Sequence, residues 1–99
     1  MTQTTVRILA RMSAFPDRLE EAKALLIGLV EPTRQESGCI RYELLQNLSD
    51  PTEFTFIEEW ESEAALNAHL SSAHISQAFA QVPLLIASGP DIMRHTLLI

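Results

Sequence analysis

The stretch CIRYELLQNLSDPTEFTFIEEWE, residues 39–61, carries the clearest structural signal in the chain. It contains two β-prone runs, Cys39–Asn47 and Glu53–Glu61, separated by five turn-forming residues, which is the pattern of a β-hairpin. A register in which paired residue numbers add up to 100 places Arg41 opposite Glu59, whereas a shift by one residue would oppose two glutamates. The first register is therefore expected, with the pairs Ile40–Trp60, Tyr42–Glu58 and Leu44–Phe56.

The segment before this hairpin predicts one strand and one helix. Apolar residues alternate with other residues over about residues 4–13, as in a strand. Apolar residues then recur at three- and four-residue spacing over about residues 17–36, as on one face of a helix. Gly38 lies where a glycine commonly follows a helix.

The segment after the hairpin predicts a second helix and a last strand. Ser62 is the expected N-cap of a helix over about residues 62–81. Two adjacent serines should kink or break this helix near residues 71–73. An irregular passage marked by prolines and a glycine is expected over residues 83–90, followed by a strand over residues 91–99.

The order β-α-β-β-α-β predicts an α+β, ferredoxin-like domain that spans residues 1–99. Its four-stranded antiparallel sheet would carry both helices on one face and leave the other face bare. The strands offer apolar side chains to both faces, among them Leu9, Leu45, Ile57, Met93, Leu97 and Ile99. A half-apolar open face on so small a domain predicts that a second copy packs against it, so a homodimer is expected.

Composition and charge exclude several classes of partner. The 99 residues carry a formal net charge of −6, and the seven Lys and Arg residues are scattered. Nucleic acid and anionic membrane surfaces are therefore not expected partners. No apolar run approaches the roughly 18 residues of a membrane span, and Met1–Thr5 shows no secretion signal, so a cytoplasmic protein is expected.

Residues 36–79 resemble an antibiotic biosynthesis monooxygenase (ABM) domain. The characteristic pieces are Gly38-Cys39 leading into Tyr42, Glu58 two residues before Trp60, and Leu66, His69-Leu70 and His74 on the following helix. The resemblance implies a homodimeric αβ-barrel with a pocket in each subunit between the sheet and its helices. Some members of this family oxygenate polycyclic phenols or quinols with O₂ and without flavin, haem or metal, because the deprotonated substrate itself donates an electron to O₂.

Neither haem nor a nucleotide cofactor is expected. The catalytic Asn, Trp and His of the haem-degrading relatives fall at positions that match Ala10, His69 and Phe79 here, and none of the three is retained. The chain has only three glycines and no glycine-rich nucleotide-binding loop.

His69 is the candidate catalytic base. It shares an apolar helical stripe with Leu66 and Leu70, so it should face the sheet, where an imidazole can accept a phenolic proton near neutral pH. A core histidine bonded to a backbone carbonyl fits the same pattern. His74, a substrate-binding candidate, follows five residues later, which rotates a regular helix by about 140°. The two histidines should therefore point apart, and with no cysteine or carboxylate at a suitable spacing no metal site is predicted.

Glu58 lies between two aromatic residues of one strand face, so it should be ion-paired, protonated or exposed in a cavity. Its candidate cationic partners are Arg94, Arg7 and Arg11. Trp60 on the same face can form a wall for a planar ligand or belong to the core, and Tyr42 can bond Glu58 across the hairpin.

Three functions fit these residues. The first is a cofactor-independent monooxygenase that oxidises a quinol or polyphenol with O₂, with His69 as base and Trp60, Tyr42, Glu58 and Arg94 shaping the pocket. The second is a non-redox enzyme that isomerises or degrades a small metabolite by proton transfer. The third is a dimeric module that binds a small aromatic or apolar molecule without catalysis.

Overall fold

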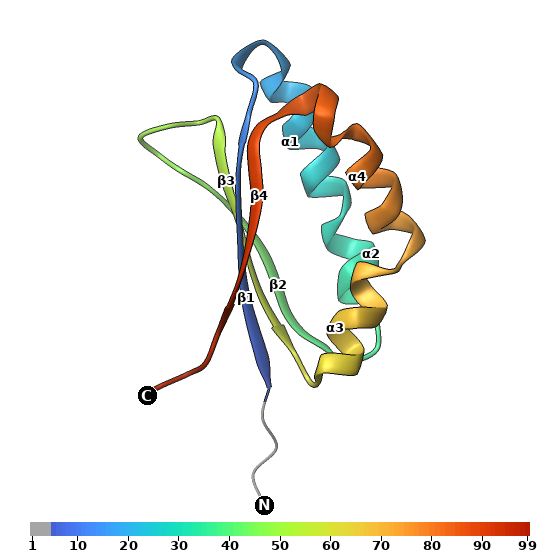
Figure 1. Ribbon diagram of the computed structural model, residues 1–99. Helices are drawn as coiled ribbons and strands as arrows, with labels where there is room; N and C mark the ends of the chain where they lie inside the picture. Colours follow the sequence, from blue (N-terminus) through green and yellow to red (C-terminus); the bar gives the residue numbers. More distant parts are fainter. Residues whose placement is uncertain (1–4) are drawn as a thin grey trace, which may run out of the picture.

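The computed structural model describes residues 5–99 and contains a four-stranded sheet with helices packed on one side (Figure 1). In chain order the elements are β1 (Val6–Ala14), the 3-10 helix η1 (Pro16–Arg18), α1 (Leu19–Gly28), α2 (Val30–Arg34), β2 (Cys39–Gln46), β3 (Glu53–Trp60), α3 (Glu63–Leu70), α4 (Ala73–Leu85) and β4 (Ile86–His95). Residues 1–4, which include the expected start of the first strand and most of the segment inspected for a secretion signal, lie outside the described residues.

The sheet has the antiparallel order β2-β3-β1-β4, and the helices cover one of its faces (Figure 1). This arrangement confirms the expected α+β, ferredoxin-like fold. Alternate side chains of the two central strands point toward the helices and form the core, as the period of a strand requires. Ile8 on β1 and Phe54 and Trp60 on β3 are the largest apolar side chains that are completely buried.

The hairpin register predicted from charge is confirmed from Arg41 to Gln46. Within this part the structure contains the expected pairs Arg41–Glu59, Tyr42–Glu58 and Leu44–Phe56. A bulge before Arg41 makes Cys39 the partner of Trp60, so the expected Ile40–Trp60 pair is wrong. The extra residue of a bulge is left unpaired, and Ile40 is exposed at the edge of the sheet.

The helical segment after β1 is interrupted, so the single helix expected over residues 17–36 is wrong. Helix α1 ends at Gly28 and α2 begins at Val30. Pro32 supplies the physical reason, because it has no N–H to donate to the carbonyl of Gly28 four residues earlier. The short α2 turns Thr33 inward, where it is completely buried.

The helical segment after β3 begins and breaks as expected. The hydroxyl oxygen of Ser62 accepts a hydrogen bond of 3.1 Å from the backbone N–H of Ala65, which confirms the N-cap. Helix α3 ends at Leu70 and α4 begins at Ala73, which confirms the predicted break. No helix within residues 5–99 is long and apolar enough to cross a membrane.

The end of the chain differs from expectation at three points. Helix α4 continues through Pro83 to Leu85 because Val82 and Leu85 still pack on the core, and burial outweighs the missing N–H of the proline. Strand β4 then begins directly at Ile86, so residues 83–90 belong to α4 and β4 and not to a loop, but the expected irregularity is present as register shifts of β4 against β1 between Ile86 and Asp91. The strand also ends at His95 instead of residue 99, since His95 pairs with Arg7 beside the first residue of β1.

The sheet face away from the helices has an apolar centre and charged surroundings. Leu9 lies between Ile57 of β3 and Met93 of β4, and all three are partly exposed. Around them lie the ion pairs Arg7–Glu59 at 3.4 Å and Arg11–Glu53 at 2.8 Å. Helices leave this open face uncovered in Figure 1.

Gly38, between α2 and β2, brings this turn close to α3. Its φ of +85° is a conformation that other residues rarely adopt, and a Cβ added there would lie 2.6 Å from the Cβ of Ala65. Glycine therefore allows α3 to pack directly on the turn that follows α2.

Gly38→Ala is expected to lower the free energy of unfolding by about 2–4 kcal/mol, since the backbone strain alone costs about 1–3 kcal/mol and the contact with Ala65 adds to it. Gly28→Ala is the matched control, because an added Cβ meets nothing within 4 Å there. Alanine at this helical position is expected to stabilise the protein by about 0.5–1 kcal/mol. Urea unfolding checks both values, and equal stability of the two variants would contradict the account.

Candidate functional site

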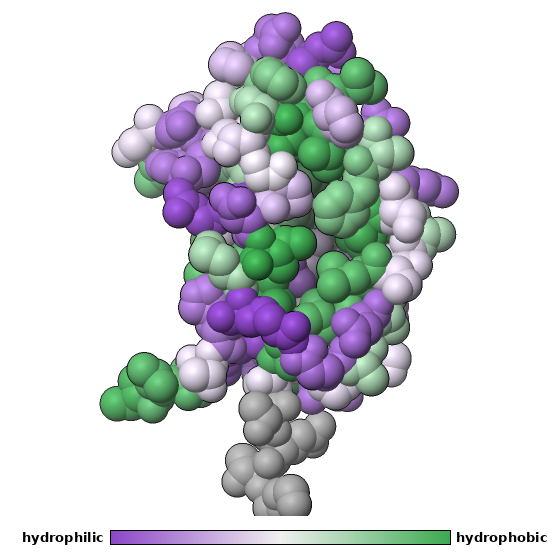
Figure 2. Space-filling view, viewed as in Figure 1, coloured by the Kyte–Doolittle hydropathy of each residue, from purple (hydrophilic) through white to green (hydrophobic). Residues whose placement is uncertain are grey.

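A cavity of about 70 Å³ lies between the sheet and the helices. Its walls are apolar except for three polar side chains, those of Tyr42, Glu58 and His69. The partly exposed side chains Leu70, Phe79 and Ile92 also line it and mark its mouth. Figure 2 shows apolar groups gathered along this hollowed seam between the sheet and the helices.

His69 on α3 points toward the sheet, as expected for the candidate base, and only 3% of it is exposed. Its Nδ1 lies 2.7 Å from Oε2 of Glu36. A carboxylate only accepts hydrogen bonds, so Nδ1 carries the proton and donates it. Burial lowers the pKa of His69 more than the Glu36 carboxylate raises it, so the imidazole is neutral near pH 7 and Nε2 keeps its lone pair.

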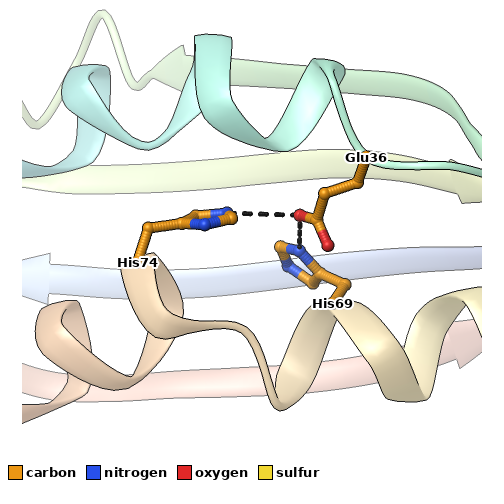
Figure 3. A group of neighbouring side chains, drawn as sticks. All are labelled: Glu36, His69 and His74. Atoms are coloured by element: carbon orange, nitrogen blue, oxygen red, sulfur yellow. Dashed lines mark hydrogen bonds and ion pairs between the residues drawn. The ribbon is translucent and has the colours of Figure 1, made fainter.

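His74 at the start of α4 contacts the same carboxylate. Its Nε2 lies 3.2 Å from Oε2 of Glu36 and 3.1 Å from Oγ1 of Thr33. Figure 3 shows the two histidines on separate helical segments, with the carboxylate between them. The expectation that they point apart is wrong, because it assumed an unbroken helix and the chain breaks between Leu70 and Ala73. His74 does not line the cavity.

Glu36 was not among the candidates from the sequence. The turn after α2 holds it in place, since its N–H donates to the carbonyl of Thr33 and its carbonyl accepts from the N–H of Cys39. The close packing at Gly38 then brings its side chain to His69. A glutamate beside a turn glycine looks like an ordinary surface residue in the sequence, and only the glycine signal pointed to this turn.

Glu58 on β3 lines the cavity and is 6% exposed. Burial raises the pKa of its carboxyl to about 7, although the hydrogen bond from Nε1–H of Trp60, at 2.9 Å, lowers it. At neutral pH the carboxyl group is therefore present in both protonation states, so it can donate or accept a proton at the cavity wall.

The arginine partners expected for Glu58 are wrong. Arg94 contacts Glu63 at the start of α3 instead, and Arg7 and Arg11 pair with acidic residues of β3 on the open face. A strand alternates its side chains between the two faces, so Arg7 and Arg11 cannot reach a group on the helix-covered face. Arg94 does not line the cavity.

Tyr42 and Trp60 take different positions around His69. Tyr42 lines the cavity, with its ring centroid 5.5 Å from that of His69. Burial, reinforced by the charge of Glu58, raises the pKa of the Tyr42 phenol, which therefore stays protonated as a donor. Trp60 is completely buried at 4.6 Å from the His69 ring and does not line the cavity, so it supports Glu58 and His69 from behind and forms no wall for a ligand.

The arrangement can move protons inside an apolar space. His69 offers a basic nitrogen, and Glu58 and Tyr42 offer hydrogen-bond donors at the same cavity. A basic nitrogen and proton donors whose pKa values are shifted by burial are typical of a site where a proton leaves one atom of a ligand and returns to another.

Comparisons with known proteins indicate one family. The sequence model of the antibiotic biosynthesis monooxygenase family matches residues 5–81 of this chain. A Mycobacterium tuberculosis protein with a provisional monooxygenase name is 36% identical over 82% of this chain and 79% of its own length. An uncharacterised Synechocystis protein is 34% identical over 78% of this chain, and the match spans only 52% of that protein.

Solved structures agree with the sequence comparison. A Pseudomonas aeruginosa protein superposes with a TM-score of 0.93 at 29% identity, covering 100% of this chain and 99% of that one. The structure of the Mycobacterium tuberculosis relative superposes with a TM-score of 0.90 at 30% identity, covering 97% of both chains.

Glu58→Gln is expected to remove a pH dependence of stability. The folded carboxyl has a pKa of about 7 against an ordinary 4.5, so the folded state holds its proton longer than the unfolded state. Wild-type stability therefore falls as pH rises from about 4.5 to about 7, by about 3 kcal/mol from this group. Glutamine keeps an oxygen for the Trp60 N–H and does not ionise. Urea unfolding measures the free energy of unfolding of both proteins. Between about pH 4.5 and about pH 8 this free energy should rise for the variant relative to wild type by about 3 kcal/mol, whereas a difference that does not change with pH would contradict the raised pKa.

Proposed function

Because the chain belongs to the antibiotic biosynthesis monooxygenase family, we propose that it oxidises a small quinol or polyphenol with O₂ and takes the electrons from the substrate itself. The family match and the name of the Mycobacterium tuberculosis relative support a monooxygenase-type role. The substrate proposal depends on the position of His69. Its imidazole is neutral, its Nδ1 donates a hydrogen bond to Glu36, and its ring lines an apolar cavity.

The first step is removal of a proton from a quinol O–H by Nε2 of His69. The Nδ1–H stays bonded to Glu36, so the carboxylate orients the ring and stabilises the imidazolium that forms. An apolar cavity favours this transfer to a nearby base over the release of a proton to water.

The second step is reaction of the resulting phenolate with O₂. The phenolate gives one electron to O₂, and the two radicals join to form a C–O bond and a peroxide. The peroxide takes up the proton from His69. Its O–O bond then breaks with loss of water, and the carbon that held it becomes a carbonyl. The quinol and O₂ thus give a hydroxyquinone and water, and no other reductant is required.

Glu58 and Tyr42 are proposed to hold the substrate and the developing oxygen anions. The phenol of Tyr42 donates a hydrogen bond, and the protonated fraction of Glu58 donates another. Donors fixed in a dry site stabilise charge that appears during the reaction better than mobile water does.

The size of the cavity favours a substrate with one ring. About 70 Å³ is roughly half of the about 150 Å³ of a cavity that holds benzene, so even a single-ring substrate would extend into the mouth. A polycyclic phenol would require Phe79, Leu70 and Ile92 to move at the mouth.

We also propose that the protein is a homodimer joined through the open face. Leu9, Ile57 and Met93 form an apolar centre there, and the surrounding ion pairs are typical of an interface rim.

His69→Gln is expected to lower kcat/KM for a single-ring quinol by about 10²–10⁴-fold, the usual contribution of a general base. Glu36→Gln keeps an acceptor for Nδ1–H but loses the charge, so a smaller loss of about 10-fold is expected. His95→Gln, at an exposed histidine away from the cavity, is the control. Oxygen-electrode assays with purified protein measure these effects, with circular dichroism to verify folding.

Full activity of His69→Gln would remove the base from the mechanism. Turnover without O₂ would contradict the monooxygenase proposal and support a non-redox enzyme with the same residues. Saturable quinol binding without any product would support a ligand-binding module.

Ile57→Arg is expected to convert the dimer into a folded monomer, because it places a charge at the apolar centre of the open face. Sedimentation velocity of both proteins checks this. A monomeric wild type, or an unchanged dimer of the variant, would contradict the proposed interface.

A further inference from the structure

We propose that Glu36, His69 and His74 form a binding site for a divalent transition-metal ion, with Zn²⁺ as the best fit, and that the bound ion prevents His69 from acting as a base. The metal site rests on geometry alone. Its effect on His69 rests on the proposed function.

The three side chains offer the donor set that Zn²⁺ prefers. One ring nitrogen of His69, one ring nitrogen of His74 and one carboxylate oxygen of Glu36 all lie within 4.8 Å of one another. This is the one group of three or more such ligands found within residues 5–99. Two imidazoles and a carboxylate, with a fourth position open to water, are an established zinc ligand set.

The two distances from the carboxylate oxygen to the histidine nitrogens approach those around a coordinated ion. Tetrahedral Zn²⁺ with bonds of about 2.0–2.2 Å sets its ligand atoms about 3.4 Å apart. Oε2 of Glu36 lies 2.7 Å from Nδ1 of His69 and 3.2 Å from Nε2 of His74. Small side-chain rotations would therefore open the group enough to admit the ion.

The site is accessible and its ligands come from three separate segments. Glu36 follows α2, His69 lies near the end of α3, and His74 lies at the start of α4 (Figure 3). The side chains of Glu36 and His74 are 18% and 26% exposed, so an ion can reach them from solvent without crossing the cavity. Oγ1 of Thr33 lies 3.1 Å from Nε2 of His74, the nitrogen that would bind the ion, so this hydrogen bond would be replaced when the ion binds.

The ion would bind Nδ1 of His69, whereas the proposed base is Nε2 of the same ring. A neutral imidazole has one proton, and metal coordination through Nδ1 moves that proton to Nε2. Nε2 then has no lone pair to accept a proton from a quinol. The cavity keeps its shape, but the base is lost while the ion is bound.

Binding is tested by isothermal titration of metal-free, tag-free protein with Zn²⁺, and by the visible absorption of the Co²⁺ complex. Wild type is expected to bind one ion per chain and to show the Co²⁺ bands of a four-coordinate site. His74→Gln and Glu36→Gln are each expected to weaken Zn²⁺ binding by at least about 100-fold, since loss of an outer-shell partner alone costs about 10–100-fold.

His95→Gln is the matched control, because His95 is the remaining histidine of the chain and is exposed on β4. It is expected to bind Zn²⁺ as wild type does. The site is overturned if wild type binds no ion, or if His74→Gln and Glu36→Gln both bind as tightly as His95→Gln.

The effect on the base is tested by quinol oxidation with and without saturating Zn²⁺. Zn²⁺ is expected to inhibit wild type by at least about 10-fold, and a chelator should reverse the inhibition. The quinol oxidation rate of the His74→Gln variant should be the same with and without Zn²⁺. Binding without inhibition would overturn the switch. Binding by a protein that never turns over a quinol would overturn the proposed function and leave the metal site standing.

Discussion

The Glu36 carboxylate, placed between two histidines, is the interaction on which the chemistry of this molecule depends. Its bond of 2.7 Å to Nδ1 of His69 decides which imidazole nitrogen carries the proton, and therefore which nitrogen is basic. The same oxygen reaches His74. One ionic group thus sets the protonation of a buried ring and links it to a partly exposed one.

Three local features of the backbone bring this carboxylate into place. Pro32 lies in the first turn of α2, where it prevents α1 from continuing as one helix, and the short α2 ends at Arg34, just before Glu36. Gly38 lets the next turn pack against Ala65 of α3. The break between Leu70 and Ala73 changes the direction of the chain, so that two histidines from successive helices face one carboxylate. Together these features determine the geometry of the site.

The parts of the structure that depend on short-range patterns could be predicted from the sequence. Alternation gave the strands, opposed glutamates excluded the wrong register, and Ser62 marked the start of α3. The pairing of His69 with Glu36 could not be predicted, because it depends on a tertiary contact 33 residues apart. The partner of Arg94 was wrong for a similar reason, since neither strand pattern nor charge shows that α3 starts within its reach. Burial on both sides of Pro83 likewise overrode the usual effect of proline.

The central claim is that His69 is a neutral base, with its proton on Nδ1 and its lone pair on Nε2. Long-range ¹H–¹⁵N correlation spectra of the histidine rings at pH 7 measure this directly. A protonated Nδ1 and an unprotonated Nε2 are expected for His69. The hydrogen bond to Glu36 should shift the Nδ1 proton signal downfield, and this shift should be lost in Glu36→Ala. A proton on Nε2, or an imidazolium at this pH, would contradict this claim.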